Sequence, residues 1–213
     1  MSSRLNERAH FVAEQIEARG VRDPLLLAAM RAVPREDFVP EDIGDEAYED
    51  YPLPIGEGQT ISQPFMVAFM IEALGLAGGE KVLEIGAGSG YASAVLSKIA
   101  GSVFAIERIG SLAKRAASRL ADLGFSNIHV RHADGIRGWW AEAPFDAILV
   151  SAGAVEIPKV LEQQLCIGGH MVVPIGHYSQ DQDLIRLTRV GETEFNKESL
   201  GPVRFVPLIG GLG

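Results

Sequence analysis

A glycine-rich segment carries the first chemical signal in this sequence. Residues 84–91 read Glu-Ile-Gly-Ala-Gly-Ser-Gly-Tyr and continue the apolar run 82–85. Glycine permits positive φ and close approach of a ligand to the backbone, and the first amides of a following helix point outward. We therefore expect a strand, a ligand-binding turn that includes Gly86, Ala87 and Gly88, and then a helix.

Two carboxylates follow this turn at positions that suit a nucleoside. Glu107 ends the next expected strand, seventeen residues beyond Gly90, at the sheet edge where ligands of open α/β folds bind. A carboxylate there can accept hydrogen bonds from both hydroxyls of a ribose. Asp134, followed by Gly135, comes just after the next strand and can accept one from an adenine amino group. Singly, Glu107 could be a solvated strand end and Asp134 a turn former, but together with the turn they favour a nucleoside ligand.

A dinucleotide site fits the glycine-rich segment poorly. The fingerprint G-x-G-x-x-G would need glycine at position 91, where this chain has Tyr91. Glu107 would also repel the 2′-phosphate of NADP. A NAD-dependent dehydrogenase is therefore disfavoured.

The elements that must position these residues alternate along the chain. Five apolar runs are expected to be strands: 82–85, 103–106, 128–130, 147–150 and 171–175. Three segments between them are expected to be helices: 90–100, 109–123 and 156–166. This alternation is typical of a parallel sheet with helices on both faces. After Gly176 no helix is evident, and 184–190 and 203–208 are expected to be consecutive antiparallel strands.

The first third of the chain is expected to be mostly helical. Apolar spacing over 5–16 predicts one amphipathic helix, and Asp23 as N-cap predicts a second over 24–32. A third is expected over 64–76. The intervening segment 34–58, rich in proline and glycine, resists regular assignment and is either an ordered loop or a connector.

Length and composition fit one domain. The chain has 213 residues, 47% of them apolar, and we expect a single domain over 1–213. Its parts would be N-terminal helices with a substrate loop, 1–76, and a cofactor-binding core, 77–213. The net charge of -9, with scattered basic residues, argues against a nucleic-acid partner. Charges in the first twenty residues and the absence of an 18-residue apolar stretch argue against a signal peptide and a membrane partner.

Cysteine and histidine offer no metal site. The lone Cys166 excludes an intramolecular disulfide and a cysteine-based zinc site, and it fits a reducing cytoplasm. His129 and His132 lie three apart on an expected strand and so face opposite ways. We expect a cytoplasmic protein without a metal.

The glycine turn, the ribose acid and the adenine acid, in this order, resemble the Rossmann-like S-adenosylmethionine-dependent methyltransferases. More closely, nearly the whole chain is similar to the protein-L-isoaspartate O-methyltransferase family. Besides the glycine turn, these segments carry the resemblance: 23–24, 33–35, 38–40, 47–48, 52–56, 58–64, 143–146 and 203–208. Segments 59–64 and 203–208 are the most specific to the family.

The resemblance implies a fold, an activity and partners. The fold would be a Rossmann-like, doubly wound, mostly parallel α/β sheet with antiparallel C-terminal strands and an N-terminal helical extension. S-adenosyl-L-methionine would donate a methyl group to the free carboxylate of isoaspartyl residues in damaged proteins and peptides, initiating repair through a succinimide. We expect a monomer, and activity on D-aspartyl residues is left open. With Gly86 and Gly88 of the turn, the expected cofactor contacts are Gln59, Thr60, Ile61, Ser62, Ala87, Glu107, Arg108, Asp134 and Gly135.

Ser62 has two interpretations. Before Gln63 and Pro64, either Ser62 or Gln63 can cap the third helix. By the resemblance, Ser62 lies beside the transferred methyl group and its hydroxyl can hold the acceptor carboxylate in line, as the catalytic residue. The roles are compatible. A carboxylate is ionised at neutral pH, so alignment rather than a strong general base is what the reaction needs.

Two further functions stay open at this point. The chain could esterify an ordinary aspartate to form an aspartimide, or it could bind a nucleoside without catalysis. The extended segment 203–208 is our candidate for gripping a peptide backbone, with a closing strand of the sheet as its alternative. Departures from the family pattern at 152–154, 166–167 and Trp140 bear on acceptor detail and leave the cofactor residues intact.

Overall fold

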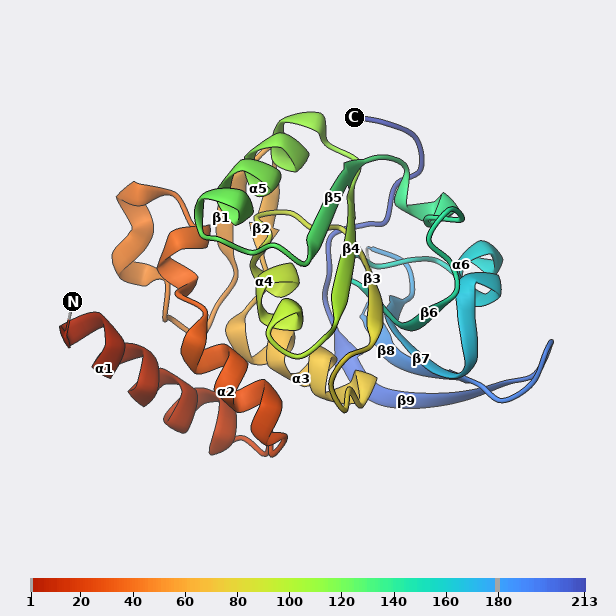
Figure 1. Ribbon diagram of the computed structural model, residues 1–213, viewed down its shortest axis with the longest axis horizontal. Helices are drawn as coiled ribbons and strands as arrows, with labels where there is room; N and C mark the ends of the chain where they lie inside the picture. Colours follow the sequence, from red (N-terminus) through yellow and green to blue (C-terminus); the bar gives the residue numbers. More distant parts are fainter. Residues whose placement is uncertain (1, 179–180) are drawn as a thin grey trace.

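A seven-stranded sheet forms the centre of the protein (Figure 1). The computed structural model describes residues 2–178 and 181–213. The strands are β3 (Lys81–Ile85), β4 (Ser102–Glu107), β5 (Ile128–His132), β6 (Phe145–Val150), β7 (Leu165–Ile175), β8 (Gln182–Arg189) and β9 (Phe195–Val203). Their order is β5-β4-β3-β6-β7-β8-β9; β8 pairs antiparallel with both β7 and β9, and all other neighbouring strands pair in parallel. The expected Rossmann-like sheet with antiparallel C-terminal strands is confirmed.

The helices cover the two faces of the sheet unequally. They are α1 (Ser2–Phe11), which continues as a π-helical turn over Val12–Glu17, α2 (Pro24–Ala32), α3 (Pro64–Leu74), α4 (Tyr91–Ser97), α5 (Gly110–Asp122) and α6 (Lys159–Gln164). One core joins the first five helices to Val82, Val103 and Leu149 of the sheet. The other lies on the opposite face, where Leu161 of α6 packs with Leu83. The N-terminal helices therefore extend only one side of the sheet.

The three N-terminal helices lie close to their expected positions. The Asp23 carboxylate accepts from the amides of Leu25 and Leu26, so it caps α2 as expected. Helix α6 is shorter than expected, because Leu165 already begins β7.

The segment between α2 and α3 is ordered, so the ordered-loop interpretation is the correct one. It contains two 3₁₀ helices, Arg35–Phe38 and Glu41–Glu46, and an antiparallel hairpin of β1 (Leu53–Gly56) and β2 (Gln59–Ile61). Strands of four and three residues are too short for a clear alternating pattern. The hairpin brings Thr60 and Ser62 over the carboxyl edge of the sheet, beside the turn after β3.

The expected final strand over 203–208 is wrong. Strand β8 pairs instead with Phe195–Val203, whose residues are largely exposed and so lack an apolar pattern. Residues 204–208 run along the carboxyl edge of the sheet, where the Phe205 backbone bonds the Gln182 side chain of β8 and Pro207 forms an isolated bridge with Gly153. There the Gly153 amide donates to the Val206 carbonyl (2.8 Å), and the Leu208 amide donates to the Gly153 carbonyl (2.7 Å). This segment is apolar because it walls the site described next.

Candidate functional site

The turn after β3 has the backbone conformation that its glycines allow. Gly86, Gly88 and Gly90 have φ of 87°, 55° and 90°, a region that other residues avoid. The amides of Gly86 and Ala87 donate to the Ile106 carbonyl of β4, at 2.8 and 3.1 Å. The turn is therefore held against β4 and leaves its outer side to a ligand.

Glu107 ties this turn to the end of β4. One carboxylate oxygen accepts from the Gly88 amide and the other from the Ile109 amide, both at 2.9 Å. The residue is only 6% exposed. Each carboxylate oxygen can accept a second hydrogen bond, so Glu107 keeps capacity for two hydroxyl groups.

Asp134 combines a local role with a contact to the end of the chain. Its Oδ1 accepts from the Ile136 amide (3.0 Å), which caps the 3₁₀ helix Gly135–Arg137. Its Oδ2 accepts from the Gly211 amide (2.9 Å). The interpretation of Asp134 as a turn former therefore describes one of its roles, and acceptor capacity remains for a ligand.

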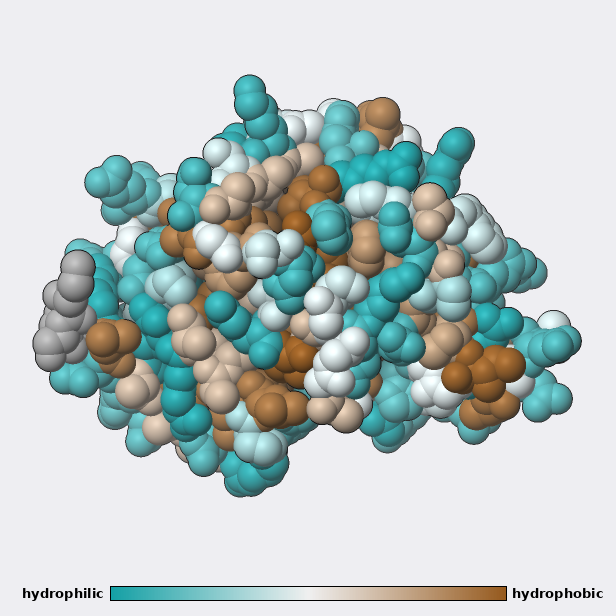
Figure 2. All heavy atoms as spheres, in the orientation of Figure 1, coloured by the Kyte–Doolittle hydropathy of each residue, from teal (hydrophilic) through white to brown (hydrophobic). Residues whose placement is uncertain are grey.

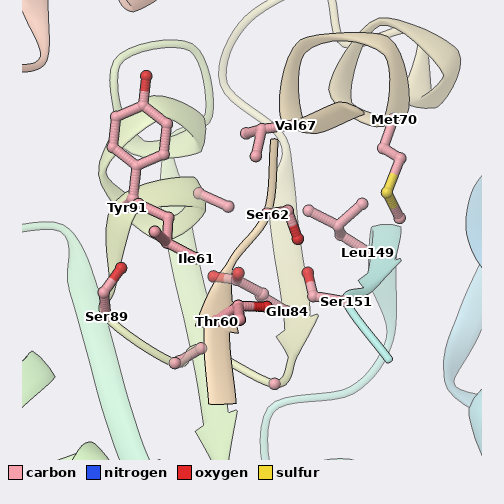
Figure 3. A pocket seen from close by; sticks show the side chains of 14 residues that line it. Thr60, Ile61, Ser62, Val67, Met70, Glu84, Ser89, Tyr91, Leu149 and Ser151 are labelled. Carbon is pink, nitrogen blue, oxygen red and sulfur yellow. The ribbon is translucent and has the colours of Figure 1, made fainter. Parts of the chain in front are cut away.

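Two adjoining cavities collect ten of the eleven residues expected at the cofactor. We name the first the Glu107 cavity; its expected members are Gln59, Thr60, Gly86, Gly88, Glu107, Arg108 and Gly135. We name the second the Glu84 cavity (Figure 3); its expected members are Thr60, Ile61, Ser62, Gly86, Ala87 and Gly88. Asp134 lies beside Gly135 and does not itself line either cavity.

A wide groove opens beside these cavities. We name it the Arg204 groove; it is lined by residues of the hairpin, of β8 and of segment 202–206. Thr60 and Ser151 border the groove and both cavities, and Ser62 borders the groove and the Glu84 cavity. A small molecule in the cavities and a polymer in the groove would therefore meet at these three hydroxyl groups.

The structure also adds residues that the sequence did not single out. The Glu107 cavity is walled by Pro207, Leu208 and Ile209 near the C-terminus. This tail is held where the Gly213 amide donates to the Arg108 carbonyl (2.9 Å) and the Gly110 amide donates to the Gly213 carbonyl (3.2 Å). The family resemblance of segment 203–208 pointed to this region, but the apolar residues of the segment suggested a strand.

Ser62 does not cap α3. The N-cap residue is Gln63, the other expected candidate, although its side chain makes no capping hydrogen bond, so only the capping interpretation of Ser62 is wrong. The Ser62 carbonyl instead accepts from Nη2 of Arg35 (2.9 Å), and Arg35 Nε donates to the Ala47 carbonyl (2.7 Å). Arg35 is fully buried, and burial lowers its pKa to about 10. A buried guanidinium thus fixes the backbone of Ser62.

Glu84 is a buried acid in the wall of the Glu84 cavity. Burial raises its pKa to about 8, an effect that the Ser93 hydroxyl opposes through a hydrogen bond and that the nearby Glu107 carboxylate reinforces. At neutral pH the carboxyl group is therefore mostly protonated. The motif contained this residue, but only the structure reveals its complete burial.

The two histidines of β5 have structural contacts. His129 stacks on Phe104, with ring centroids 4.9 Å apart, and Nε2 of His132 lies 3.0 Å from the Arg108 carbonyl oxygen. Over residues 2–178 and 181–213, no three His, Cys, Asp or Glu side chains form a group that could hold a metal ion.

The Rossmann-like sheet, the glycine turn, the acid that ends β4 and the recess between them are the features of the class of S-adenosylmethionine-dependent methyltransferases. Residues 6–213 match the family model described as protein-L-isoaspartate(D-aspartate) O-methyltransferase (PCMT). The chain belongs to this family.

Individual relatives agree with the family model. Protein-L-isoaspartate O-methyltransferase 1 of Rhodopseudomonas palustris strain HaA2 is 61% identical over 97% of this chain and 84% of the relative. The enzyme of strain ATCC BAA-98 / CGA009 is 58% identical over 95% of this chain and 93% of its own. Among solved structures, a β-aspartate methyltransferase of Plasmodium falciparum, in complex with S-adenosyl-L-homocysteine, superposes with a TM-score of 0.82. It is 26% identical and covers 95% of this chain and 98% of its own.

We predict that Glu84 makes stability fall as pH rises. The folded protein binds this proton more tightly than the unfolded chain, whose glutamate has a pKa near 4.5. Stability is therefore lost between about pH 4.5 and 8, at about 1.4 kcal/mol per pKa unit. Urea denaturation at pH 5 and pH 8 should show a smaller loss for Glu84→Gln than for the wild type.

Glu14→Gln is the matched control, because Glu14 is exposed. It should keep the pH dependence of the wild type. An equal pH dependence in all three proteins would show that Glu84 is already ionised in the folded state.

Proposed function

We propose that this chain transfers a methyl group from S-adenosyl-L-methionine to the free α-carboxylate of isoaspartyl residues in damaged proteins and peptides. The observation that carries the proposal is the meeting of two cavities and one groove at Thr60, Ser62 and Ser151, in a chain of the protein-L-isoaspartate O-methyltransferase family. The ester product can close to a succinimide, which hydrolyses partly to normal aspartate.

The Glu107 cavity fits the nucleoside of this cofactor. The Glu107 carboxylate would accept the ribose hydroxyls, while Arg108, Asp134 and Gly135 would lie around the adenine. An added Cβ on Gly135 would come within 2.4 Å of Ile85 Cγ2, so only glycine keeps this wall of the recess open. Bound there, the cofactor supplies a methyl group already activated by positively charged sulfur.

The hairpin and the groove would place the acceptor. Thr60 and Ser62 border both a cofactor cavity and the groove, while Gln59 lines the Glu107 cavity and Ile61 lines the Glu84 cavity. The Ser62 hydroxyl would donate to the acceptor carboxylate and hold it in line with the methyl group. No protein base is required, because an ionised carboxylate is itself the nucleophile. Good alignment and exclusion of water can contribute about 7 to 11 kcal/mol to such a reaction.

We further propose that the chain acts as one domain and as a monomer in the cytoplasm, without a nucleic-acid or membrane partner. Residues 1–76 would form the helical and hairpin part of the site, and residues 77–213 its core. On the face drawn in Figure 2, brown side chains form small areas separated by teal ones. No helix among the described residues is long and apolar enough to span a membrane.

We predict that Glu107→Ala weakens binding of S-adenosyl-L-methionine and S-adenosyl-L-homocysteine by about tenfold to a hundredfold. A hydrogen bond to a charged group typically contributes about 1.5 to 3 kcal/mol. Isothermal titration calorimetry measures the change, with the exposed Glu14→Ala as control. Wild-type affinity in Glu107→Ala would contradict the proposed place of the ribose.

We predict that an isoaspartyl peptide is methylated at least about a hundredfold more efficiently than its normal aspartyl twin, a difference of roughly 2.7 kcal/mol in transition-state binding. The two peptides have equal charge and composition, but one methylene moves from side chain to backbone. Initial rates at subsaturating peptide give the ratio. Equal rates would leave a methyltransferase and favour the aspartimide-forming alternative over repair.

A further inference from the structure

Ser151 stands at the carboxyl end of β6, directly beside the glycine turn. Its amide donates to the Ile85 carbonyl at 2.8 Å, which fixes it against the end of β3. A Cβ built on Gly86 would lie 3.7 Å from Ser151 Cβ. The side chain therefore projects from a rigid position in the middle of the sheet edge, unlike Ser62, which lies between the hairpin and α3.

The Ser151 hydroxyl faces the space where the cavities and the groove meet. Ser151 borders all three, and Ser62 borders two of them. In Figure 3 the two hydroxyl groups point toward the same space, one from each side. Within the described ranges, neither hydroxyl has a hydrogen-bond partner in the protein. Both are therefore free to donate to a ligand in that space.

The charges around this space make neutral donors important. The Glu84 cavity is lined by Glu84 itself, and no lysine or arginine lines it among the residues described. In the groove the cation is Arg204, whose Nε lies 2.9 Å from Oδ1 of Asp181. The chain as a whole carries a net charge of -9. An anionic acceptor at the junction would thus depend on hydroxyl donors for its orientation.

A carboxylate needs more than one donor to be held in a single orientation. One oxygen must face the methyl group, while the group can rotate about its bond to the neighbouring carbon. One hydrogen bond leaves much of this rotation free. Donors on two sides restrict it without adding a charge that would compete with the positively charged sulfur.

We infer that Ser151 is a second acceptor-orienting residue, whose hydroxyl holds the isoaspartyl carboxylate together with that of Ser62; this rests on the proposed function. Ser151 would act on the acceptor rather than on the nucleoside.

The test compares Ser151→Ala, Ser151→Thr and the control Ser118→Ala, whose serine is exposed on α5. Each protein is assayed for kcat and KM with an isoaspartyl peptide, for its Kd for S-adenosyl-L-homocysteine and for its melting temperature. Loss of one hydrogen bond to a charged group predicts about a tenfold or greater fall in kcat/KM for Ser151→Ala. The Kd should change less than about twofold, and Ser151→Thr, which keeps the hydroxyl, should recover most of the activity.

A double variant, Ser62→Ala with Ser151→Ala, separates shared from independent action. If both hydroxyls hold one carboxylate, the combined loss differs from the product of the single losses. Wild-type kcat/KM in Ser151→Ala overturns the inference, as does a fall in cofactor affinity equal to the fall in activity. A wild-type protein that binds the cofactor but leaves every isoaspartyl peptide unmethylated overturns the proposed function as well, so the two failures are distinguishable.

Discussion

The buried guanidinium of Arg35 is the contact on which the geometry of the site depends. Burying an ion is costly unless hydrogen bonds compensate it. Arg35 donates to Ala47 and Ser62 carbonyls, and its Cζ lies 4.9 Å from the centre of the Tyr91 ring. The second 3₁₀ helix, the hairpin and the start of α4 thus meet on one charged group. It adds a direct contact at the Ser62 backbone to the pairing of Ile61 with Leu53 and the hydrogen bond from Gln63 to the Asp50 carbonyl.

Tyr91, which contacts the Arg35 guanidinium, is also the residue that distinguishes this glycine turn from a dinucleotide-binding turn. Its ring packs edge-on against Phe38 at 5.5 Å, and its hydroxyl lies 3.7 Å from the Met30 sulfur. The residue that breaks the dinucleotide fingerprint is therefore the anchor of the N-terminal extension. The glycine turn stays open to a ligand, while the space behind it is filled by buried side chains from the N-terminal extension.

Hydrogen bonds also link the expected adenine-binding residues to the C-terminal residues. Asp134 accepts the Gly211 amide, and Arg108 accepts the Gly213 amide through its carbonyl. Arg108 and Asp134, which are expected near the adenine, thus also hold residues 211–213 in place.

The parallel strands could be predicted because each of them contains an apolar run. The ligand-binding turn could be predicted because the glycines and the two acids follow one another in a fixed order. The β1–β2 hairpin could not be predicted, because its two strands are too short to show an alternating pattern and are separated by a turn that includes Gly56, Glu57 and Gly58. Strand β9 was missed because it is exposed and polar, while apolar 203–208 lines a cavity instead of a sheet. Nothing in the sequence distinguishes Ser151 from other strand-end serines. Its role depends on the Ile85 backbone contact and on a hairpin that is distant in sequence.

In the proposed complex, a carboxylate in the Arg204 groove meets the methyl donor between Ser62 and Ser151. A crystal structure with S-adenosyl-L-homocysteine and an isoaspartyl peptide tests it most directly. We expect the ribose hydroxyls on Glu107, and the isoaspartyl carboxylate between the two serine hydroxyls with one oxygen facing the sulfur. A carboxylate bound at Arg204 and away from both serines, or a nucleoside bound away from Glu107, would contradict it.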